Sequence, residues 1–390
     1  MKKNNLIISF LIVVVLFLNP ERSSSELDLD YTGYIYNLPS YMKMPEAADL
    51  FGLDFEEDYF FLDLTRFRFM PDLHITENSR ITMHYELDMI WSKYSLPYLT
   101  GVDMTNRQAL DLKWTLIDEE KFKAQHYIDM LYYKHLFDFG EITVGRQVIS
   151  WGVGRIWQPM DLFNPINPAN FSKFEKDGAD AVSAKIYLGM FSDVEVVYNF
   201  REKWEDANFG GRYRTNFQMF DLALMAGYFD KRTILGASFE GDVLGAGIRG
   251  EGIFSYNEND TDSNFVRFIL GADYQFTPDL YALIEYKFNG EGTDCKTCYD
   301  IGRLFRGEIL NVSRNYLTGQ ANYKLHALVN LNAGGNINLN DESGYANLVI
   351  EWETLSNLKL SAAGIYFWGG RWSEYSYYST TYYLMGQFYF

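Results

Sequence analysis

Residues 382–390 read YYLMGQFYF and end the chain. Alternate positions separate into two faces, one with Tyr382, Leu384, Gly386, Phe388 and Phe390 and the other with Tyr383, Met385, Gln387 and Tyr389. A period of two is typical of a β-strand whose two faces meet different surroundings. A strand that finishes on an aromatic residue is expected where it closes a sheet against the first strand. The stretch therefore predicts the last strand of a barrel.

The same alternation recurs along the chain, in residues 81–91, 266–276, 280–289, 327–338 and 346–352. A soluble β-sandwich would show this period too, with its apolar face packed inward. The alternating segments here run to about 10–13 residues, longer than the ~5–6 of soluble sheets and suited to a tilted membrane span. Short connections such as 275–279, 324–327 and 354–357 also alternate with long ones such as 256–264, 290–312 and 367–378. This asymmetry favours a transmembrane barrel.

We expect an all-β fold, an antiparallel up-and-down barrel of about 18 strands, with 16–20 open. The expected strands are 58–70, 79–93, 106–117, 124–136, 141–149, 179–188, 193–201, 210–217, 221–229, 233–240, 243–256, 264–276, 279–289, 313–324, 328–338, 344–353, 357–367 and 378–390. Residues 27–37 are a further strand candidate. A barrel of this width has a lumen that side chains cannot fill, so water or an inserted loop occupies it.

Composition agrees with this architecture. The chain has 17% aromatic residues, with 30 Tyr and 30 Phe against 9 Pro, yet its mean hydropathy is −0.21. A membrane barrel needs apolar side chains only on alternate residues and aromatic belts at both interfaces. No linker or shift in composition divides the chain, so we expect one domain.

The N-terminus resembles a secretory signal in its physical pattern. Lys2 and Lys3 precede an apolar run from Leu6 to Leu18, which is too short to span a bilayer as a helix, and Ser23 and Ser25 are small. We expect a signal peptide in residues 1–25 and a mature start near Glu26; the alternative is an uncleaved anchor. Removal of this segment leaves 31 basic and 51 acidic residues, a net charge of −20. Such acidity argues against nucleic-acid binding, which needs clustered Lys and Arg.

The strand phases place charged side chains on the lumen wall. The acids are Glu86, Asp88, Asp111, Asp129, Glu195, Glu251, Asp273, Glu285 and Glu351, and the bases are Lys113, Lys185, Arg249, Arg267, Lys287, Lys324 and Lys359. Because the two signs nearly balance, the wall predicts only a weak preference for cations.

Residues 141–168, EITVGRQVISWGVGRIWQPMDLFNPINP, interrupt the alternation. A strand over 141–149 runs into a segment with Trp151, Gly152, Gly154, Trp157, Pro159, Asn164, Pro165, Asn167 and Pro168. Asn-Pro favours turns and proline stops a strand ladder, so about 30 residues form a loop before the next strand near Ala179. A loop of this length is usually functional or packed on itself. We expect residues 150–178 to fold into the lumen.

These residues also carry a family resemblance. Gly145-Arg146-Gln147, Ser150-Trp151-Gly152 and Asp161 to Pro168 resemble a segment of proteobacterial porin-like outer-membrane proteins, including alginate-export-type and related uncharacterised porins. The terminal Phe390 is similar to the assembly signal of such proteins. The resemblance implies a Gram-negative outer-membrane location, contact with outer-membrane lipid and reading of Phe390 by the barrel-assembly machinery. The predicted wall lacks the excess of Arg and Lys that export of a polyanion such as alginate requires.

Arg146 does not fit the alternation of its own strand. It is in phase with Ile142, Val144 and Val148, which would aim it at lipid, where a charge costs about 2–4 kcal/mol at the midplane. A bulge at Gly145 that turns Arg146 inward is the favoured interpretation, and a position at the membrane rim is the alternative. We expect Arg146, Arg155 and Asp161 to line a pore constriction; equally, Arg155 and Asp161 could only fasten the loop.

Other candidate sites point to less chemistry. Cys295 and Cys298 lie in a long loop, and a local disulfide is expected in an oxidising compartment, ahead of a redox or metal role. Acidic clusters at 54–58, 117–120 and 257–262 lack the spacing of a calcium loop, so no metal site is expected. The five histidines stand in no local catalytic motif, and we expect neither an enzyme nor a cofactor.

Together these patterns predict residues 26–57 as an N-terminal periplasmic or lumenal segment and residues 58–390 as the barrel. The expected function is passive diffusion of small hydrophilic solutes or ions through a porin-like channel. The alternatives are a barrel that sheathes a periplasmic or multihaem cytochrome partner, and a specific transporter of an oligosaccharide or hydrophobic compound. The oligomeric state, including a homotrimer, stays open at this point.

Overall fold

The computed structural model describes residues 28–45, 58–93, 107–165, 175–305 and 309–390. These residues form one antiparallel sheet of nineteen strands. The strands are β1 (Asp28–Lys43), β2 (Tyr59–Thr76), β3 (Ser79–Ser92), β4 (Lys113–Asp118), β5 (Phe122–Phe137), β6 (Gly140–Gln147), β7 (Ala179–Tyr187), β8 (Asp193–Asn199), β9 (Asn208–Phe217), β10 (Phe220–Phe229), β11 (Arg232–Val243), β12 (Ala246–Tyr256), β13 (Phe265–Thr277), β14 (Leu280–Asn289), β15 (Asn315–His326), β16 (Val329–Asn338), β17 (Gly344–Leu355), β18 (Leu358–Trp368) and β19 (Thr381–Tyr389). Short helices in the connections are η4 (Trp204–Asp206), η5 (Thr261–Ser263), η6 (Lys296–Cys298), α2 (Ile301–Phe305) and η7 (Glu374–Tyr377).

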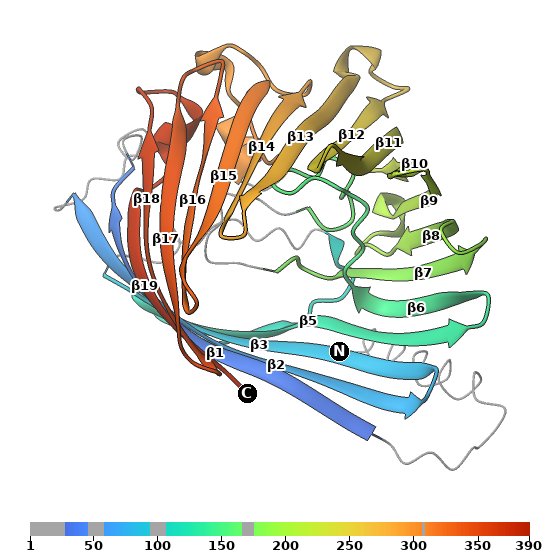
Figure 1. Cartoon of the computed structure of the whole chain (residues 1–390), viewed down its shortest axis with the longest axis horizontal. Coiled ribbons are helices and arrows are strands. Elements are labelled where there is room, and N and C mark those ends of the chain that lie inside the picture. Colours follow the sequence, from blue (N-terminus) through green and yellow to red (C-terminus); the bar gives the residue numbers. More distant parts are fainter. Residues whose placement is uncertain (1–27, 46–57, 94–106, 166–174, 306–308) are drawn as a thin grey trace.

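Eighteen of the described strands form a closed ring. Each pairs with its neighbour in the chain, except that β3 pairs with β5, and β19 returns to pair with β1. In Figure 1 the red β19 accordingly lies beside the blue β1. The prediction of an antiparallel up-and-down barrel of about 18 strands is confirmed.

The nineteenth strand, β4, is a short branch of the wall. It pairs with the first part of β5, from Lys113 opposite Tyr127 to Asp118 opposite Lys123. The later part of β5, from Leu131 onward, pairs with β6. The prediction that 106–117 is a full wall strand is therefore wrong, and Asp111 and Lys113 are not on a strand that spans the wall. The preceding residues follow the rim instead, because the backbone N–H groups of Ala109 and Leu110 donate to the Asp180 carboxylate at 2.7 and 2.8 Å.

The first wall strand is β1, so the prediction of a separate segment over residues 26–57 is wrong for residues 28–43. Its alternation is masked by tyrosines on both faces: Tyr36 is buried inside, whereas Tyr41 is exposed outside. Pro39 also lies within the strand and lacks an N–H group for the ladder. Asn37 pairs with Gly386 of β19, and the next residue of β1 to pair with β19 is Ser40, opposite Tyr383. Leu38 and Pro39 are skipped in this ladder.

The two rims of the barrel differ. One rim, the turn end, carries short connections such as 77–78, 218–219 and 356–357, together with Asp28 and Phe390. The other rim, the loop end, carries the long connections, including 148–178, 290–314 and 369–380. This is the alternation of short and long connections predicted from the sequence.

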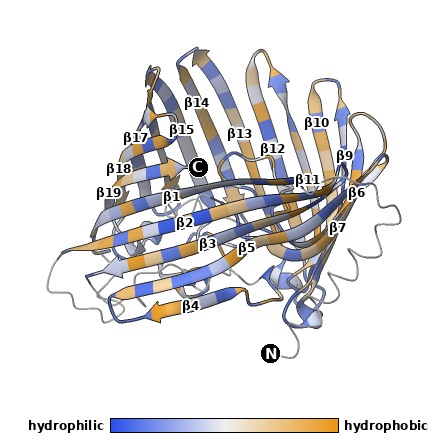
Figure 2. Ribbon diagram, turned by 90° about the horizontal axis from the view of Figure 1, so that it is seen from below, coloured by the Kyte–Doolittle hydropathy of each residue, from blue (hydrophilic) through white to orange (hydrophobic). Residues whose placement is uncertain are grey.

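Hydrophilic and hydrophobic residues alternate along the strands (Figure 2), and exposed apolar side chains such as Leu224, Leu270 and Leu384 lie on the outer face of the wall. Exposed aromatic side chains gather toward both rims, with Tyr41, Phe61 and Trp91 toward the loop end and Phe217, Phe276, Tyr323 and Trp352 toward the turn end. Aromatic belts at two heights are typical of membrane barrels. Within the described part of the chain, no helix is long and apolar enough to cross a membrane.

Closure of the ring depends on a close contact at Gly33. Phe390 exchanges both backbone hydrogen bonds with Gly33, at 2.9 and 3.0 Å, and its ring stacks on Phe67. A Cβ atom added to Gly33 would collide with the Phe390 ring and with the carbonyl oxygen of Arg68. Only glycine lets β1 and the terminal residue lie this close.

Gly33→Val should therefore weaken closure by about 1–3 kcal/mol, the usual cost of overpacking. The expected result is a lower urea midpoint and less of the heat-modifiable folded band on semi-native gels. Gly189→Val is the matched control, because a Cβ at Gly189 meets no atom within 4 Å. Equal stability of the two variants would contradict this account of closure.

Candidate functional site

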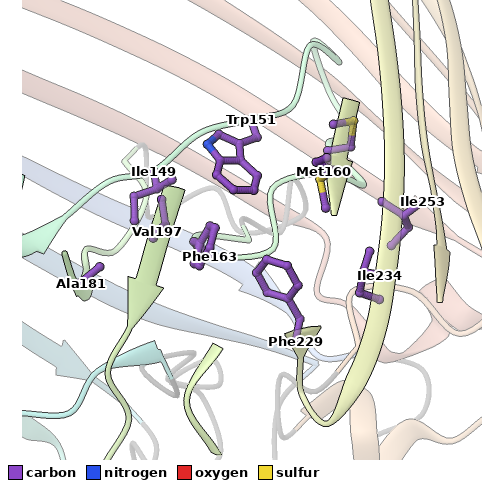
Figure 3. Close-up of a cluster of buried hydrophobic side chains, with 10 residues drawn as sticks. Ile149, Trp151, Met160, Phe163, Ala181, Val197, Phe229, Ile234 and Ile253 are labelled. Carbon is purple, nitrogen blue, oxygen red and sulfur yellow. The ribbon is translucent and has the colours of Figure 1, made fainter. Parts of the chain in front are cut away.

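The β6–β7 connection leaves the wall after Gln147 and lies inside the barrel; residues 148–165 and 175–178 of it are described. Its apolar side chains form a buried cluster with the inner wall (Figure 3). The loop contributes Ile149, Trp151, Met160 and Phe163, and the wall contributes Ala181, Val197, Met225, Phe229, Ile234 and Ile253 from β7, β8, β10, β11 and β12. Apolar residues of β7, β8, β10, β11 and β12 thus mark where this part of the loop packs, whereas a separate apolar cluster with Tyr36, Leu38, Leu64 and Met385 lies on β1, β2 and β19.

Asp161 fixes the shape of this loop. Its buried carboxylate accepts the backbone N–H of Trp151 at 2.5 Å and of Gly152 at 2.7 Å, and the Ser150 hydroxyl at 2.8 Å. Lys176, on the returning limb, forms an ion pair with the same carboxylate. Asp161 therefore joins the two limbs of the loop and is 2% exposed. This geometry matches the fastening role that the sequence left open for it.

Two glutamates of the far wall hold the loop by its backbone. Glu251 of β12 accepts N–H groups from Val153, Gly154 and Met160, the last two at 3.2 and 3.0 Å. Glu285 of β14 accepts those of Arg155 and Trp157, at 3.1 and 2.7 Å. Both carboxylates are at most 3% exposed. Buried carboxyl groups need such donors, because each buried polar group left without a hydrogen bond costs about 1–3 kcal/mol.

Gly152 is required for this approach. A Cβ there would lie 3.0 and 3.1 Å from the two carboxylate oxygens of Glu251 and 2.8 Å from Cβ of Gln158. The glycine noted in the sequence thus serves the contact between loop and wall.

Trp157 forms the tip of the loop. Its indole N–H donates to the Thr318 hydroxyl of β15 at 2.8 Å, and Nζ of Lys287 lies 3.8 Å from the centre of its ring. Trp151 is anchored in a similar way. Its indole N–H donates a hydrogen bond to Glu195 at 3.0 Å, and the guanidinium group of Arg212 lies over its ring. The loop therefore runs along the inner wall from β7 to β15.

The returning limb reaches the opposite wall through Glu175. The Tyr34 hydroxyl donates to Glu175 at 3.1 Å, and Arg68 lies 3.2 Å from it. Arg68 also pairs with Glu86 and with Asp129, and it is fully buried. The loop thus touches both sides of the lumen and narrows it.

Arg66 extends this cluster on β2. Its guanidinium group pairs with Asp88 at 2.7 Å and with Glu86 at 2.9 Å. The buried charges on β2, β3 and β5 form one network, in which the guanidinium groups of Arg66 and Arg68 are shared among three carboxylates through charge-assisted hydrogen bonds.

The three residues predicted for a constriction do not come together in this network. Arg146 is buried near the end of β6, where it pairs with Asp180 at 2.8 Å and donates to the Ile128 carbonyl at 3.0 Å. The ladders on both sides of Gly145 keep their register, so the predicted bulge there is wrong, although Gly145 has a φ of 124°. Of these three residues, only Arg155 has an exposed side chain, which is 53% accessible and lies 3.3 Å from Glu240.

The remaining predicted wall residues lie on the inner phase of their strands and are mostly paired. Arg249 pairs with Asp273, Lys185 with Glu141, Arg267 with Glu291, and Glu351 with Lys359. Asn164 accepts the Ile149 N–H at 2.6 Å, whereas Asn167 and Pro168 lie outside the described residues. Cys295 and Cys298 form a disulfide bond. In the described ranges, no group of three or more His, Cys, Asp or Glu could hold a metal ion.

A second cluster, at the loop end, surrounds Glu374 of η7. Its carboxylate accepts the Tyr316 hydroxyl at 2.7 Å, the Asn338 amide at 2.9 Å and the Val312 N–H at 3.2 Å. These contacts dock connections 290–314 and 369–380 onto the inner rim. Burial, partly offset by these donors, raises the pKa of Glu374 to about 7.

Several of these residues escaped the sequence analysis. Arg66 and Arg68 alternate with Phe67 and Phe69 within an expected strand, and the matching phase of Glu86 and Asp88 on the next strand would have revealed the pairing. Glu374 and Glu175 carry no such periodic signal, because they lie in irregular connections.

Comparison with known proteins supports the fold. No protein-family model matches the chain, and no curated protein matches it either. The OccAB4 structure from Acinetobacter baumannii is similar with a TM-score of 0.57 at 10% identity, covering 95% of this chain and 100% of that chain. OccK9 (OpdG) from Pseudomonas aeruginosa gives a TM-score of 0.57 at 10% identity, covering 93% and 98%. At this identity the likeness establishes a shared barrel architecture.

The Glu374 cluster predicts that docking of connection 369–380 onto the inner rim depends on pH. Because the folded-state pKa of Glu374 lies above the ordinary glutamate value of 4.5, docking is favoured by protonation and weakens as the pH rises toward and through about 7. Hydrogen exchange of residues 369–380, corrected for intrinsic rates, should speed up by about tenfold or more between about pH 5 and about pH 8.

Glu374→Gln should remove most of this pH dependence, since the amide stays neutral. Residues 200–207 provide the internal reference in the same samples. Equal pH dependence in the variant and the unaltered protein would show that another group controls the dock.

Proposed function

We propose that this protein is a channel of the Gram-negative outer membrane through which small hydrophilic solutes or ions diffuse passively. The observation that carries the proposal is the inward loop, which wall carboxylates hold across part of an otherwise wide polar lumen. A barrel of this width without such a loop would be a large water-filled hole. A held loop sets the size of what passes, so the structure suits a selective diffusion channel.

The outer surface supports the membrane location. The apolar wall and its two aromatic belts match the hydrocarbon core and its interfaces. With the turn end toward the periplasm, both described ends of the wall, Asp28 and Phe390, lie on that side. Phe390 faces outward there, which suits its proposed role as the signal that the assembly machinery reads.

The lumen supports diffusion more than the alternatives. The described limbs of the loop occupy the space that a sheathed cytochrome would need, which favours a channel over a sheath. Wall charges are mostly paired with one another, so the field along the path is weak and no ion of one sign is strongly excluded. We propose a non-enzymatic protein on the same grounds, because its buried polar groups serve to fasten the loop.

Release of the loop tests the proposal. Glu251→Gln together with Glu285→Gln replaces one accepting oxygen of each side chain by an N–H2 group that faces a loop N–H, which should weaken docking by about 2–4 kcal/mol. In planar bilayers the double variant should show a larger and noisier single-channel conductance than the unaltered protein.

Glu351→Gln is the matched control, because Glu351 is also on the lumen wall but pairs with Lys359 and not with the loop. Its conductance should stay close to that of the unaltered protein. Correctly folded protein that gives no conductance steps in bilayers would overturn the proposal.

Arg155 and Asp161 should respond differently to neutralisation. Arg155→Gln removes an exposed lumen cation and should raise the preference for cations with little change in noise. Asp161→Asn removes a buried fastening charge and should mainly increase current fluctuations. Reversal potentials in a salt gradient, measured beside the current noise, separate the two effects; identical changes in both variants would contradict the assigned roles.

A further inference from the structure

The outer face of the wall carries an apolar hollow across β9–β13, the green to yellow strands of Figure 1. Its volume is about 580 Å³, which falls within the ~300–1,000 Å³ of small-molecule pockets. Because the outside of a barrel is convex overall, a recess of this size needs a local cause in the sequence of these strands.

Small residues form the floor of this hollow. Gly252 of β12 lies opposite Ala237 of β11, so two adjacent strands present no more than one methyl group to the outside. Gly250, the next outer residue of β12, lies opposite Phe239, and a Cβ atom at Gly250 would lie 2.6 Å from Cε1 of that ring. The missing side chains therefore let Phe239 lie low over the glycine and keep the floor deep.

Large apolar side chains form the rim. Leu224 of β10 lies opposite Ala237 and is 62% exposed, and Leu270 of β13 lies opposite Gly250 and is 52% exposed. The small floor is thus recessed between standing side chains on both sides. The flat wall of another barrel cannot reach such a floor, whereas one flexible chain can.

The hollow lies midway across the membrane-spanning wall. Tyr213, which lines it, stands on β9 halfway between two exposed aromatic residues, Phe209 toward the loop end and Phe217 at the turn end. Aromatic belts mark the two membrane interfaces, so a position between them faces hydrocarbon.

Two polar residues that border the hollow are engaged elsewhere. Glu251 borders it through its backbone, because its carboxylate is on the lumen side and accepts the Met160 N–H at 3.0 Å. The Thr215 hydroxyl shares a hydrogen bond of 2.8 Å with Ser192. An apolar occupant therefore fits this lining better than a polar one.

We propose that this hollow is a binding site for one acyl chain of a membrane lipid. Lipid tails are as apolar as leucine, so the attraction comes from close packing and not from removal of apolar surface from water. A recess surrounds a chain on several sides and gives it more contact than the convex wall around it. The site is independent of whether the lumen conducts ions.

The floor of the hollow also backs onto an anchor of the inward loop. Gly250 and Gly252 flank Glu251, which holds the backbone N–H groups of Gly154 and Met160 on the other side of the wall. A bound chain therefore packs from outside against the strand segment that the loop contacts from inside.

A photoreactive lipid tests the site. The purified protein is placed in vesicles of dimyristoyl phosphatidylglycerol that contain a small share of the same lipid with a diazirine near the end of one chain. After irradiation, the labelled peptides are mapped by mass spectrometry. Labelling should concentrate on β10–β13 rather than spread evenly over the outer wall.

Two variants change the hollow in opposite ways. Ala237→Phe fills the floor at an exposed position and should lower the labelling of β10–β13 about fivefold or more, because the ring takes the place of the chain. Leu270→Ala removes part of the rim and should lower it less. Ala346→Phe is the matched control, because Ala346 is an exposed outer alanine of β17, and labelling of β10–β13 should stay unchanged.

Even labelling of the whole outer wall, or equal labelling of β10–β13 in Ala237→Phe and Ala346→Phe, would overturn the acyl-chain site. Unlabelled β10–β13, together with a dimer that Ala237→Phe dissociates, would overturn it too and assign the hollow to a second copy of the chain. Conductance measured on the same preparations tests the channel separately, so a conducting protein without concentrated labelling loses the lipid site alone.

Discussion

The structure depends on carboxylates that are buried in the lumen wall and satisfied by the backbone of an inserted loop. Glu251 and Glu285 face loop N–H groups that have no partner in a strand or helix. The hydrogen bonds between them satisfy the buried carboxyl groups and the loop backbone at the same time. A water-filled lumen would have left the loop free to unfold along the wall. Because this contact excludes water, its hydrogen bonds are strong enough to hold the loop in one position on the wall.

This constraint explains one of the apolar clusters inside the barrel. A pore wall is expected to be polar, yet β7, β8, β10, β11 and β12 contribute buried apolar side chains to one cluster. They lie where the loop passes. One connection thus determines which part of the wall from β7 to β12 is buried.

Much of the barrel could be predicted because a membrane wall has a period of two and asymmetric connections. Strands β11–β19 alternate clearly, and their expected ranges differ from the observed ones by a few residues. The N-terminal strands were harder: β1 has tyrosines on both faces and Pro39 in its middle, whereas 106–117 alternates yet forms only the short β4. The expected and observed strand numbers agree because these two deviations offset each other.

The site was predictable only in part, for a different physical reason. Phase identifies inner residues such as Glu251 and Glu285, and the Gly, Pro and Asn content marks the loop. Phase says nothing of which loop atom meets which wall residue, because such contacts join distant parts of the chain. The sequence therefore predicted a pore constriction for Asp161 and Arg146, whereas their partners in the structure are Lys176 and Asp180.

The pairing of Tyr34 with Tyr389 has a kinetic consequence. Other wall pairs join strands that are near neighbours in the chain, so they can form early and with little loss of chain entropy, whereas this pair must close almost the whole sequence into one loop. Closure is then the late event of folding, reached after the sheet has curled. The inserted loop links β8, β12, β14 and β15 by internal contacts, so it can hold the open sheet in its curved form and bring the two edges within reach.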